Sequence, residues 1–237
     1  MAYDFAIREQ ICEIGRRIYA KGFVAGNAGN ISCRLADGRI LCSPTMICKG
    51  FMKPDDLCVV SLDGQQRTGA EKKTSEILLH LQIYRSAPKA RAVVHCHPPH
   101  ATAFAVARVD IPTGILPETE VFLGQVPRID YETPGTDAFA AKIEPVVNQA
   151  NTALLCNHGT VSWADSVERA YWYTEILEDY CRVLLLAKQL GHVERLPAEK
   201  VRELLALRPN FDMPPDPRLD PGAKLFVNPD FPHATDR

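Results

Sequence analysis

The stretch VVHCHPPHATAFAV, residues 93–106, begins as an apolar strand, continues toward a helix, and carries three histidines within six positions. Side chains at i and i+2 of a strand point to the same face, so His95 and His97 are expected side by side, with their backbones roughly 7 Å apart. Two imidazoles at that separation can converge on one metal ion. The alternative is that both rings simply line a half-exposed strand face, and the pair alone favours neither interpretation.

A third histidine favours the metal site. His158 ends the apolar run TALLCNHG (152–159), where a strand end followed by Gly would place its ring at the rim of the sheet. Three neutral imidazoles with an open fourth position are typical of catalytic rather than structural zinc. His100 follows His97 by three residues, in a helix or turn, and is assigned a structural or supporting role.

The segment GNAGNIS (26–32) has the composition of an anion-binding turn. Gly-rich turns expose consecutive backbone N–H groups, and Asn tolerates left-handed backbone and donates hydrogen bonds. Taken alone, the segment favours an ordinary turn between a helix and a strand, because such Gly/Asn turns are common. Hydroxyl side chains in CSPTMICKG (42–50) and TSE (74–76) strengthen the anion interpretation, the latter at a predicted helix N-terminus. The hydroxyl groups of the predicted phosphate pocket belong to Ser43, Thr45, Thr74 and Ser75.

Glu76 stands in the same predicted first turn of a helix. A carboxylate there ordinarily serves only as a favourable partner of the helix dipole. Beside a divalent metal and an anion site, it is instead the natural general acid/base.

Alternating short strands and helices without an internal repeat predict an α/β fold with a central, mainly antiparallel sheet flanked by helices. Residues 1–207 are expected to form one domain, and residues 208–237 a Pro-rich tail on its surface. Seven of the 18 prolines fall between Pro209 and Pro232, which excludes helix and central strand there. The predicted strands are 30–35, 39–44, 57–64, 90–97, 121–131 and 152–159. Three helices are predicted: the first ends near Gly22, the second begins near residue 75, and the third spans 164–190.

Composition narrows the class of protein. With 46% hydrophobic and 24% charged residues, a net charge of −2 and no Lys/Arg run, a nucleic-acid partner is disfavoured. No segment has 18 uninterrupted apolar residues and the N-terminus carries charges throughout, so no membrane partner or signal peptide is expected and the protein is predicted to be cytoplasmic. The eight cysteines include no Cys-x-x-Cys pair and lie mostly in apolar runs, as reduced core thiols do.

Taken together, GNAGNIS, SPT…KG, TSE, HCHPPHATA and NHG, in this order between about residues 5 and 190, resemble the class II aldolase/adducin family and, within it, the L-fuculose-1-phosphate aldolase branch. The resemblance implies an α/β sandwich assembled as a homotetramer with active sites at subunit interfaces. It also implies a mobile C-terminal segment that closes over a site. By this resemblance Glu76 is the acid/base. The metal ligands are His95, His97 and His158, and the phosphate cradle is Gly29, Asn30, Thr45, Thr74 and Ser75.

The resemblance further implies a metal-dependent aldolase that uses Zn²⁺, Mn²⁺ or another divalent metal. It would cleave a ketose 1-phosphate, such as L-fuculose 1-phosphate or a deoxy-pentulose 1-phosphate, to dihydroxyacetone phosphate and an aldehyde. The same fold also occurs in decarboxylases, dehydratases and epimerases of this family, and these activities remain alternatives. A non-catalytic adducin-like module is disfavoured, because such relatives lack the metal histidines that are present here.

One position departs from the resembled aldolases. They carry a tyrosine after the His-x-His strand that helps protonate the leaving aldehyde from the neighbouring subunit, whereas a count without gaps places Leu116 there. Glu118 and Glu120 lie in the same segment and either supply that proton or form a solvated turn. An apolar substitution at this end of the site predicts a substrate whose distal end is less polar.

Overall fold

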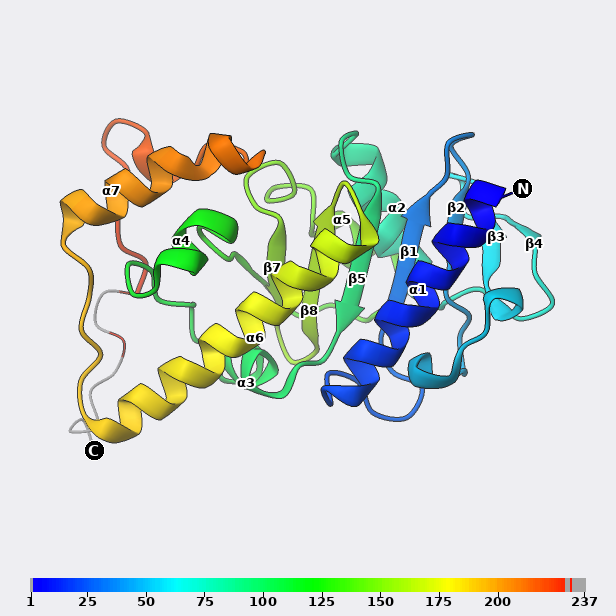
Figure 1. Ribbon diagram of the computed structural model, residues 1–237, viewed down its shortest axis with the longest axis horizontal. Helices are drawn as coiled ribbons and strands as arrows, with labels where there is room; N and C mark the ends of the chain where they lie inside the picture. Colours follow the sequence, from blue (N-terminus) through cyan, green and yellow to red (C-terminus); the bar gives the residue numbers. More distant parts are fainter. Residues whose placement is uncertain (1, 229–230, 232–237) are drawn as a thin grey trace.

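The computed structural model describes residues 2–228 and 231, which form an eight-stranded sheet with helices on both faces (Figure 1). The strand order is β4-β3-β2-β1-β5-β8-β7-β6, and all neighbours are antiparallel except the parallel pair β6 and β7. The predicted α/β fold with a mainly antiparallel sheet is thus confirmed. The strands are β1 (Asn30–Arg34), β2 (Ile40–Cys42), β3 (Cys58–Val60), β4 (Gln66–Thr68), β5 (Ala92–Cys96), β6 (Arg128–Ile129), β7 (Thr152–Leu155) and β8 (Gly159–Ala164).

Alternating side chains of the central strands serve two separate apolar layers. Along β5, Val93 packs into the layer beneath α2 and α5, whereas Ala92 and Val94 pack into the layer beneath α1 and the start of α6. This alternation is the period of two that any strand imposes, and it explains why the strand is apolar throughout. The helices are α1 (Ala2–Ala20), α2 (Ile77–Ser86), α3 (Pro99–Ala107), α4 (Pro117–Phe122), α5 (Asp137–Ala141), α6 (Val167–Leu190) and α7 (Ala198–Leu207), with 3-10 turns at Lys49–Phe51, Pro54–Asp56, Arg208–Phe211 and Pro217–Leu219.

Several boundaries differ from the sequence prediction. The predicted strand 121–131 is wrong: its first residues end helix α4, and only Arg128–Ile129 pair in the sheet. The apolar run 152–159 is two strands rather than one, because the chain reverses between β7 and β8. His158 therefore lies in a hairpin turn. Helix α2 starts one or two residues later than expected, so that Glu76 occupies its N-cap position.

The C-terminal segment follows helix α7 and packs against helix α4. It contains two 3-10 turns but, within its described residues 208–228 and 231, no α-helix or strand. Arg208 is buried and donates to the backbone oxygens of Glu120 and Val121 at 3.1 and 2.8 Å. Arg218 is buried as well and bonds the Glu120 carboxylate at 2.8 Å. This part of the predicted tail is thus anchored through buried charges, whereas residues 229–230 and 232–237 of the tail lie outside the described residues.

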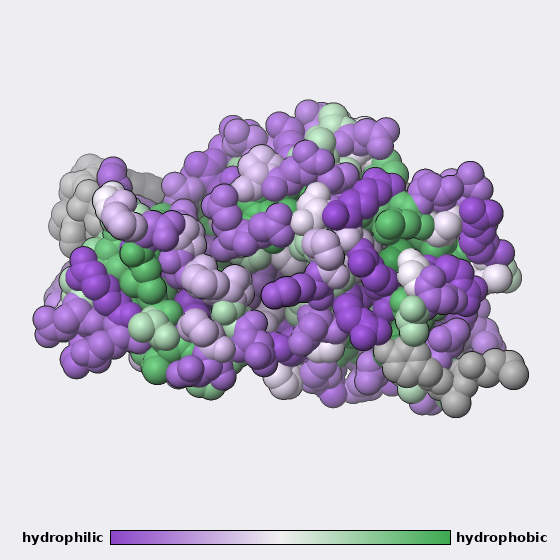
Figure 2. Space-filling model, turned by 90° about the horizontal axis from the view of Figure 1, so that it is seen from above, coloured by the Kyte–Doolittle hydropathy of each residue, from purple (hydrophilic) through white to green (hydrophobic). Residues whose placement is uncertain are grey.

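On the face drawn in Figure 2, hydrophilic side chains predominate, with apolar side chains in patches between them. Among the described residues, no helix combines the length and the apolar character that crossing a bilayer requires. All eight cysteines lie in the described part of the chain and are free thiols, and seven of them are buried, with Cys48 as the exception.

Candidate metal centre and active site

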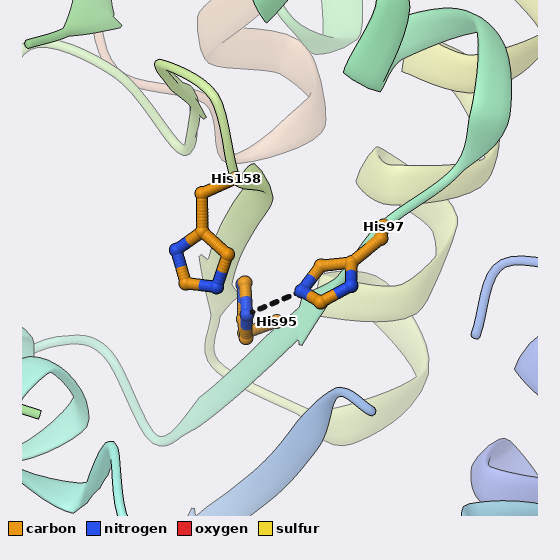
Figure 3. Close-up of side chains that lie close together, drawn as sticks. All are labelled: His95, His97 and His158. Carbon is orange, nitrogen blue, oxygen red and sulfur yellow. Dashed lines mark hydrogen bonds between the residues drawn. The ribbon is translucent and has the colours of Figure 1, made fainter. Parts of the chain in front are cut away.

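Three histidine rings meet at one end of the central strands. His95 belongs to the end of β5, His97 follows that strand directly, and His158 comes from the β7–β8 turn beside it. Figure 3 shows the rings turned toward one another, and their centroids lie 4.6–5.0 Å apart. One ring nitrogen from each lies within 4.8 Å of the other two. The predicted triad is therefore brought together, and it has the arrangement of a metal site.

The tautomer of His95 follows from its partner. Its Nδ1 lies 2.8 Å from the backbone oxygen of Thr160, which can only accept, so Nδ1 carries the proton and Nε2 is bare. Burial lowers the pKa of His95 to about 3. The pKa of His97 is lowered by burial as well, and next by the positive charge of a protonated His158. His95 and His97 are thus held as neutral imidazoles, the form that binds a metal.

Glu76 completes the centre from the N-cap of helix α2. Its Oε2 lies 3.1 Å from His95 Nε2 and its Oε1 lies 3.3 Å from His158 Nε2. Burial on its own raises the pKa of Glu76, but the neighbouring His95 and His158 and a hydrogen bond from Asn30 lower it to well below its usual range. The carboxylate is therefore ionised, and it faces the bare nitrogen of His95.

The convergence of these atoms fits a divalent cation. Two electron-rich groups, the Nε2 lone pair of His95 and the Glu76 carboxylate, lie 3.1 Å apart without a proton between them. A cation relieves that repulsion, and three imidazole nitrogens are ligands that divalent transition metals prefer. His95, His97 and His158 can therefore hold such an ion, with the Glu76 carboxylate beside it.

The turn before strand β1 lies against the histidine strand. Gly29 has a φ of +73°, and a Cβ there would come within 2.6 Å of Val24 Cγ1 and 2.9 Å of the His95 backbone oxygen. The next residue, Asn30, pairs with His95 across the two strands, and its Nδ2 donates to Glu76 Oε2 at 3.1 Å. Gly29 is required by both its conformation and its surroundings, and the Asn30 amide is engaged with Glu76.

The predicted phosphate-binding residues lie on neighbouring segments. Residues 43–45 run beside residues 72–74, joined by hydrogen bonds from Thr45 N to Lys72 O and from Thr74 N to Ser43 O. Thr74 is buried and its Oγ1 accepts from Glu76 N at 3.3 Å, whereas Thr45 is half-buried and Ser75 exposed. Ser43 is fully buried, and its hydroxyl accepts from the Ile31 N–H.

Lys49 is a residue of this region to which the sequence analysis gave no role. It is 1% exposed, and its Nζ donates to the backbone oxygens of Asn27 at 2.9 Å and Ile47 at 2.5 Å. The bonds tie the Gly/Asn turn to the segment that carries Thr45. Burial lowers the pKa of Lys49 to about 8. The signal available in the sequence was a lysine within an otherwise uncharged loop, SPTMICKG.

His100 has the supporting role that its spacing suggested. Its Nδ1 lies 2.7 Å from Glu178 of helix α6. The same carboxylate accepts from the backbone N–H groups of His100 and Ala101 at 3.1 and 2.8 Å, at the start of helix α3. The pair therefore fixes α3, which follows the histidine strand directly.

Residues 116–120, which the sequence offered as a source of a proton donor, form the start of helix α4. Leu116 is the N-cap residue of α4, and Glu118 is exposed on its first turn. Glu120 is 1% exposed, pairs with Arg218 and accepts from Gly114 N at 2.6 Å. The option that Glu120 donates a proton to substrate is thus wrong, because its carboxylate is enclosed and fully paired.

Comparison with known proteins identifies relatives along most of the chain. The family model described as "Class II Aldolase and Adducin N-terminal domain" matches residues 9–185. A 3-oxo-tetronate 4-phosphate decarboxylase of Cupriavidus necator is 36% identical over 192 residues, 79% of this chain and 88% of the relative. An L-fuculose phosphate aldolase of Methanococcus vannielii is 34% identical over 176 residues, 73% of this chain and 91% of the relative.

A solved structure from the same comparison superposes on most of the chain. The crystal structure of YgbL from Escherichia coli, described as a putative aldolase/epimerase/decarboxylase, superposes with a TM-score of 0.80 and 30% identity. The superposition covers 85% of this chain and 99% of that one.

Proposed function

This chain belongs to the class II aldolase and adducin family, and on that premise we propose that it is a metal-dependent decarboxylase of a phosphorylated 3-oxo sugar acid. The substrate we propose is 3-oxo-tetronate 4-phosphate, which the name of the Cupriavidus relative states for that protein. The observation that carries the proposal is the Glu76 carboxylate set against the converging imidazoles of His95, His97 and His158.

The aldolase activity expected from the sequence is corrected by the relatives. Decarboxylases of 3-oxo-tetronate 4-phosphate from Cupriavidus necator and Escherichia coli are 36% and 33% identical over 192 residues each. The description of the superposed YgbL structure names decarboxylase as one of three activities. Decarboxylation was among the alternatives left open.

The two reactions share most of their chemistry. In a 3-oxo acid the C1–C2 bond breaks, CO₂ leaves, and the electron pair stays on C2 in conjugation with the C3 carbonyl, so that C2 must then take up one proton. The product of 3-oxo-tetronate 4-phosphate is dihydroxyacetone phosphate, which is also an aldolase product. A leaving carboxylate is already ionised, so no residue has to handle a hydroxyl proton on the leaving fragment. This supports the proposal, because Leu116 stands where the resembled aldolases have tyrosine.

The roles we propose follow the geometry of the centre. His95, His97 and His158 would hold the divalent metal, for which we propose zinc. When bound there, such an ion withdraws charge from the substrate carbonyl oxygen. Glu76, fixed at the N-cap of α2 beside the histidines, would take up a proton from solvent water and pass it to C2 once CO₂ has left.

The phosphate would bind on the side of the Gly/Asn turn. Backbone N–H groups next to Gly29 and Asn30 and the hydroxyls of Thr45, Thr74 and Ser75 are the donors we propose for it. The buried ammonium of Lys49, which joins the two segments, adds positive charge behind them. Anchoring at the phosphate supplies binding energy remote from the bond that breaks.

Assembly as a homotetramer remains part of the proposal. Support comes from a hollow of about 1010 Å³ between α4, α6 and the turn at Arg208–Phe211, where the large apolar residue Trp172 is 49% exposed. Light scattering on the purified protein tests it, and a monomer that retains full activity would contradict it.

The reaction is tested by adding 3-oxo-tetronate 4-phosphate to the zinc-loaded protein. We expect CO₂ and dihydroxyacetone phosphate in equal amounts, the latter measured by its enzymatic reduction with NADH. The variant His95→Ala, with its metal removed, serves as the control for background decarboxylation. No CO₂ above that background would refute the proposed function.

A further inference from the structure

A buried row of hydrogen-bonding side chains leads away from Glu76 into the core. Glu76, His80 and Tyr84 recur every four residues and so share one face of helix α2 and its N-cap. Asn30 and Ser32, two residues apart on β1, face them. The contacts alternate between the two elements, and His80 and Ser32 are fully buried.

The distances join these five side chains into one chain of hydrogen bonds. Asn30 Nδ2 lies 3.1 Å from Glu76 Oε2, and Asn30 Oδ1 lies 2.5 Å from His80 Nε2. His80 Nδ1 and the Tyr84 hydroxyl each lie 2.7 Å from Ser32 Oγ. Nothing in the reaction chemistry described above uses His80, Ser32 or Tyr84.

The position of each proton follows from the contact at one end. The Asn30 amide directs its NH₂ group, which only donates, to Glu76 Oε2, and its carbonyl oxygen, which only accepts, to His80 Nε2. His80 therefore donates from Nε2, and its bare Nδ1 accepts from the Ser32 hydroxyl. Ser32 then accepts from Tyr84. Every donor meets one acceptor, and only the Nε2–H tautomer of a neutral His80 satisfies the chain.

Burial is consistent with that neutral form. It lowers the pKa of His80 to about 3, with a smaller contribution in the same direction from the nearby His95. A neutral ring with one donor and one acceptor can act as a directional clamp, whereas an imidazolium with two donors would oppose the Ser32 hydroxyl proton.

We propose that His80 is a positioning residue: by donating from Nε2 to Asn30 Oδ1, it holds the Asn30 amide with its NH₂ toward Glu76 and thereby fixes the catalytic carboxylate at the histidine centre. The inference rests on the proposed function for Glu76. Without the His80 donor, the Asn30 amide can turn over and direct its oxygen at the carboxylate, which repels it. Glu76 then loses its fixed position, while the phosphate-binding side keeps its own contacts.

Two substitutions of similar size separate positioning from simple structural support. In His80→Gln the side-chain amide reaches the place of Nε2 and can still donate to Asn30. In His80→Asn the amide reaches only the place of Nδ1, on the Ser32 side. We expect kcat to fall about 10–100-fold in His80→Asn with KM changed less than about threefold, and to stay within about threefold of wild type in His80→Gln.

Tyr84→Phe is the matched control, because it removes the far hydroxyl and leaves the His80–Asn30 contact in place. Its kcat should stay near wild type even if its melting temperature falls. Equal kcat values for His80→Gln and His80→Asn at comparable melting temperatures would overturn the inference, as would loss of kcat in all three variants in proportion to stability.

A spectroscopic test is independent of turnover. Imidazole ¹⁵N shifts of the metal-loaded wild type should report the Nε2–H tautomer for His80, and the Nδ1–H tautomer would overturn the inference. If the wild type is active but His80 shows Nδ1–H, the positioning role fails and the proposed function stands. If His80 shows Nε2–H and no CO₂ is released, the proposed function fails alone.

Discussion

Replacing Gly29 with Ala should damage the centre more than an ordinary glycine substitution. Its φ of +73° is left-handed, which costs an L-residue about 1–2 kcal/mol. The added Cβ would also meet Val24 Cγ1 at 2.6 Å and the His95 oxygen at 2.9 Å. Forcing a methyl into such a site typically costs a further ~1–3 kcal/mol, so we expect a total loss of about 2–5 kcal/mol in the free energy of unfolding. Because β1 must shift from His95, zinc affinity should fall too.

Gly26→Ala is the matched control for this substitution. Gly26 has a similar φ of +58°, but a Cβ there has nothing within 4 Å. The Gly26→Ala variant should therefore lose only about 1–2 kcal/mol of unfolding free energy, which is what a left-handed L-residue costs. Urea unfolding of both variants, with and without zinc, measures the difference, and chelator competition measures the zinc affinity. If Gly29→Ala is no less stable than Gly26→Ala and binds zinc like the wild type, the close approach of the turn to the histidine strand has no energetic weight and the reasoning fails.

Three further outcomes are expected. Glu76→Gln should keep its metal by elemental analysis while kcat falls about 10²–10⁴-fold; activity close to wild type would return Glu76 to a helix-dipole role. Arg218→Met should lose about 3–5 kcal/mol in urea unfolding, because it strands the buried Glu120 charge, and adding Glu120→Gln should restore part of that loss; an unchanged midpoint would contradict this. Burial lowers the pKa of His80 to about 3, against about 6.5 for an unfolded imidazole, so only the unfolded chain takes up this proton as pH falls from 6.5 toward 3, and stability is lost over that window. Between pH 7 and 5.5 the wild type should lose about 1.3 kcal/mol more than His80→Gln, and equal losses would rule out a neutral buried ring.

The histidine pair was predictable from the sequence because strand periodicity is local. His95 and His97 need only two residues of extended backbone to share a face, and a neighbouring Gly marked His158 as a rim residue. The hairpin that holds His158 was not predictable in the same way, because β7 and β8 join through only three residues, Cys156, Asn157 and His158, which follow an apolar run directly. Both strands are buried, so no polar alternation marked the reversal.

Residues that act through long-range partners escaped the sequence analysis. The roles of Lys49 and His80 come from contacts to segments distant in sequence. The apolar periodicity that predicts helix α2 gives no information about the histidine within it. Glu120 shows the opposite case. Its exposed-looking segment, PETE, suggested a solvated or reactive carboxylate, but Arg218, nearly a hundred residues later, folds onto it. No local pattern carries that information.

The distribution of thiols makes this protein its own reporter of unfolding. Seven of the eight cysteines are buried, and burial raises the pKa of Cys33 to about 11 and that of Cys96 to about 12. Thiolates are the nucleophiles, so these groups stay silent toward a disulfide reagent while the chain is folded. Cys48, in the loop that Lys49 tethers, is the one to react first. A chromogenic count of one rapid thiol per chain, rising toward eight as the core opens, would therefore follow opening in real time without an introduced label.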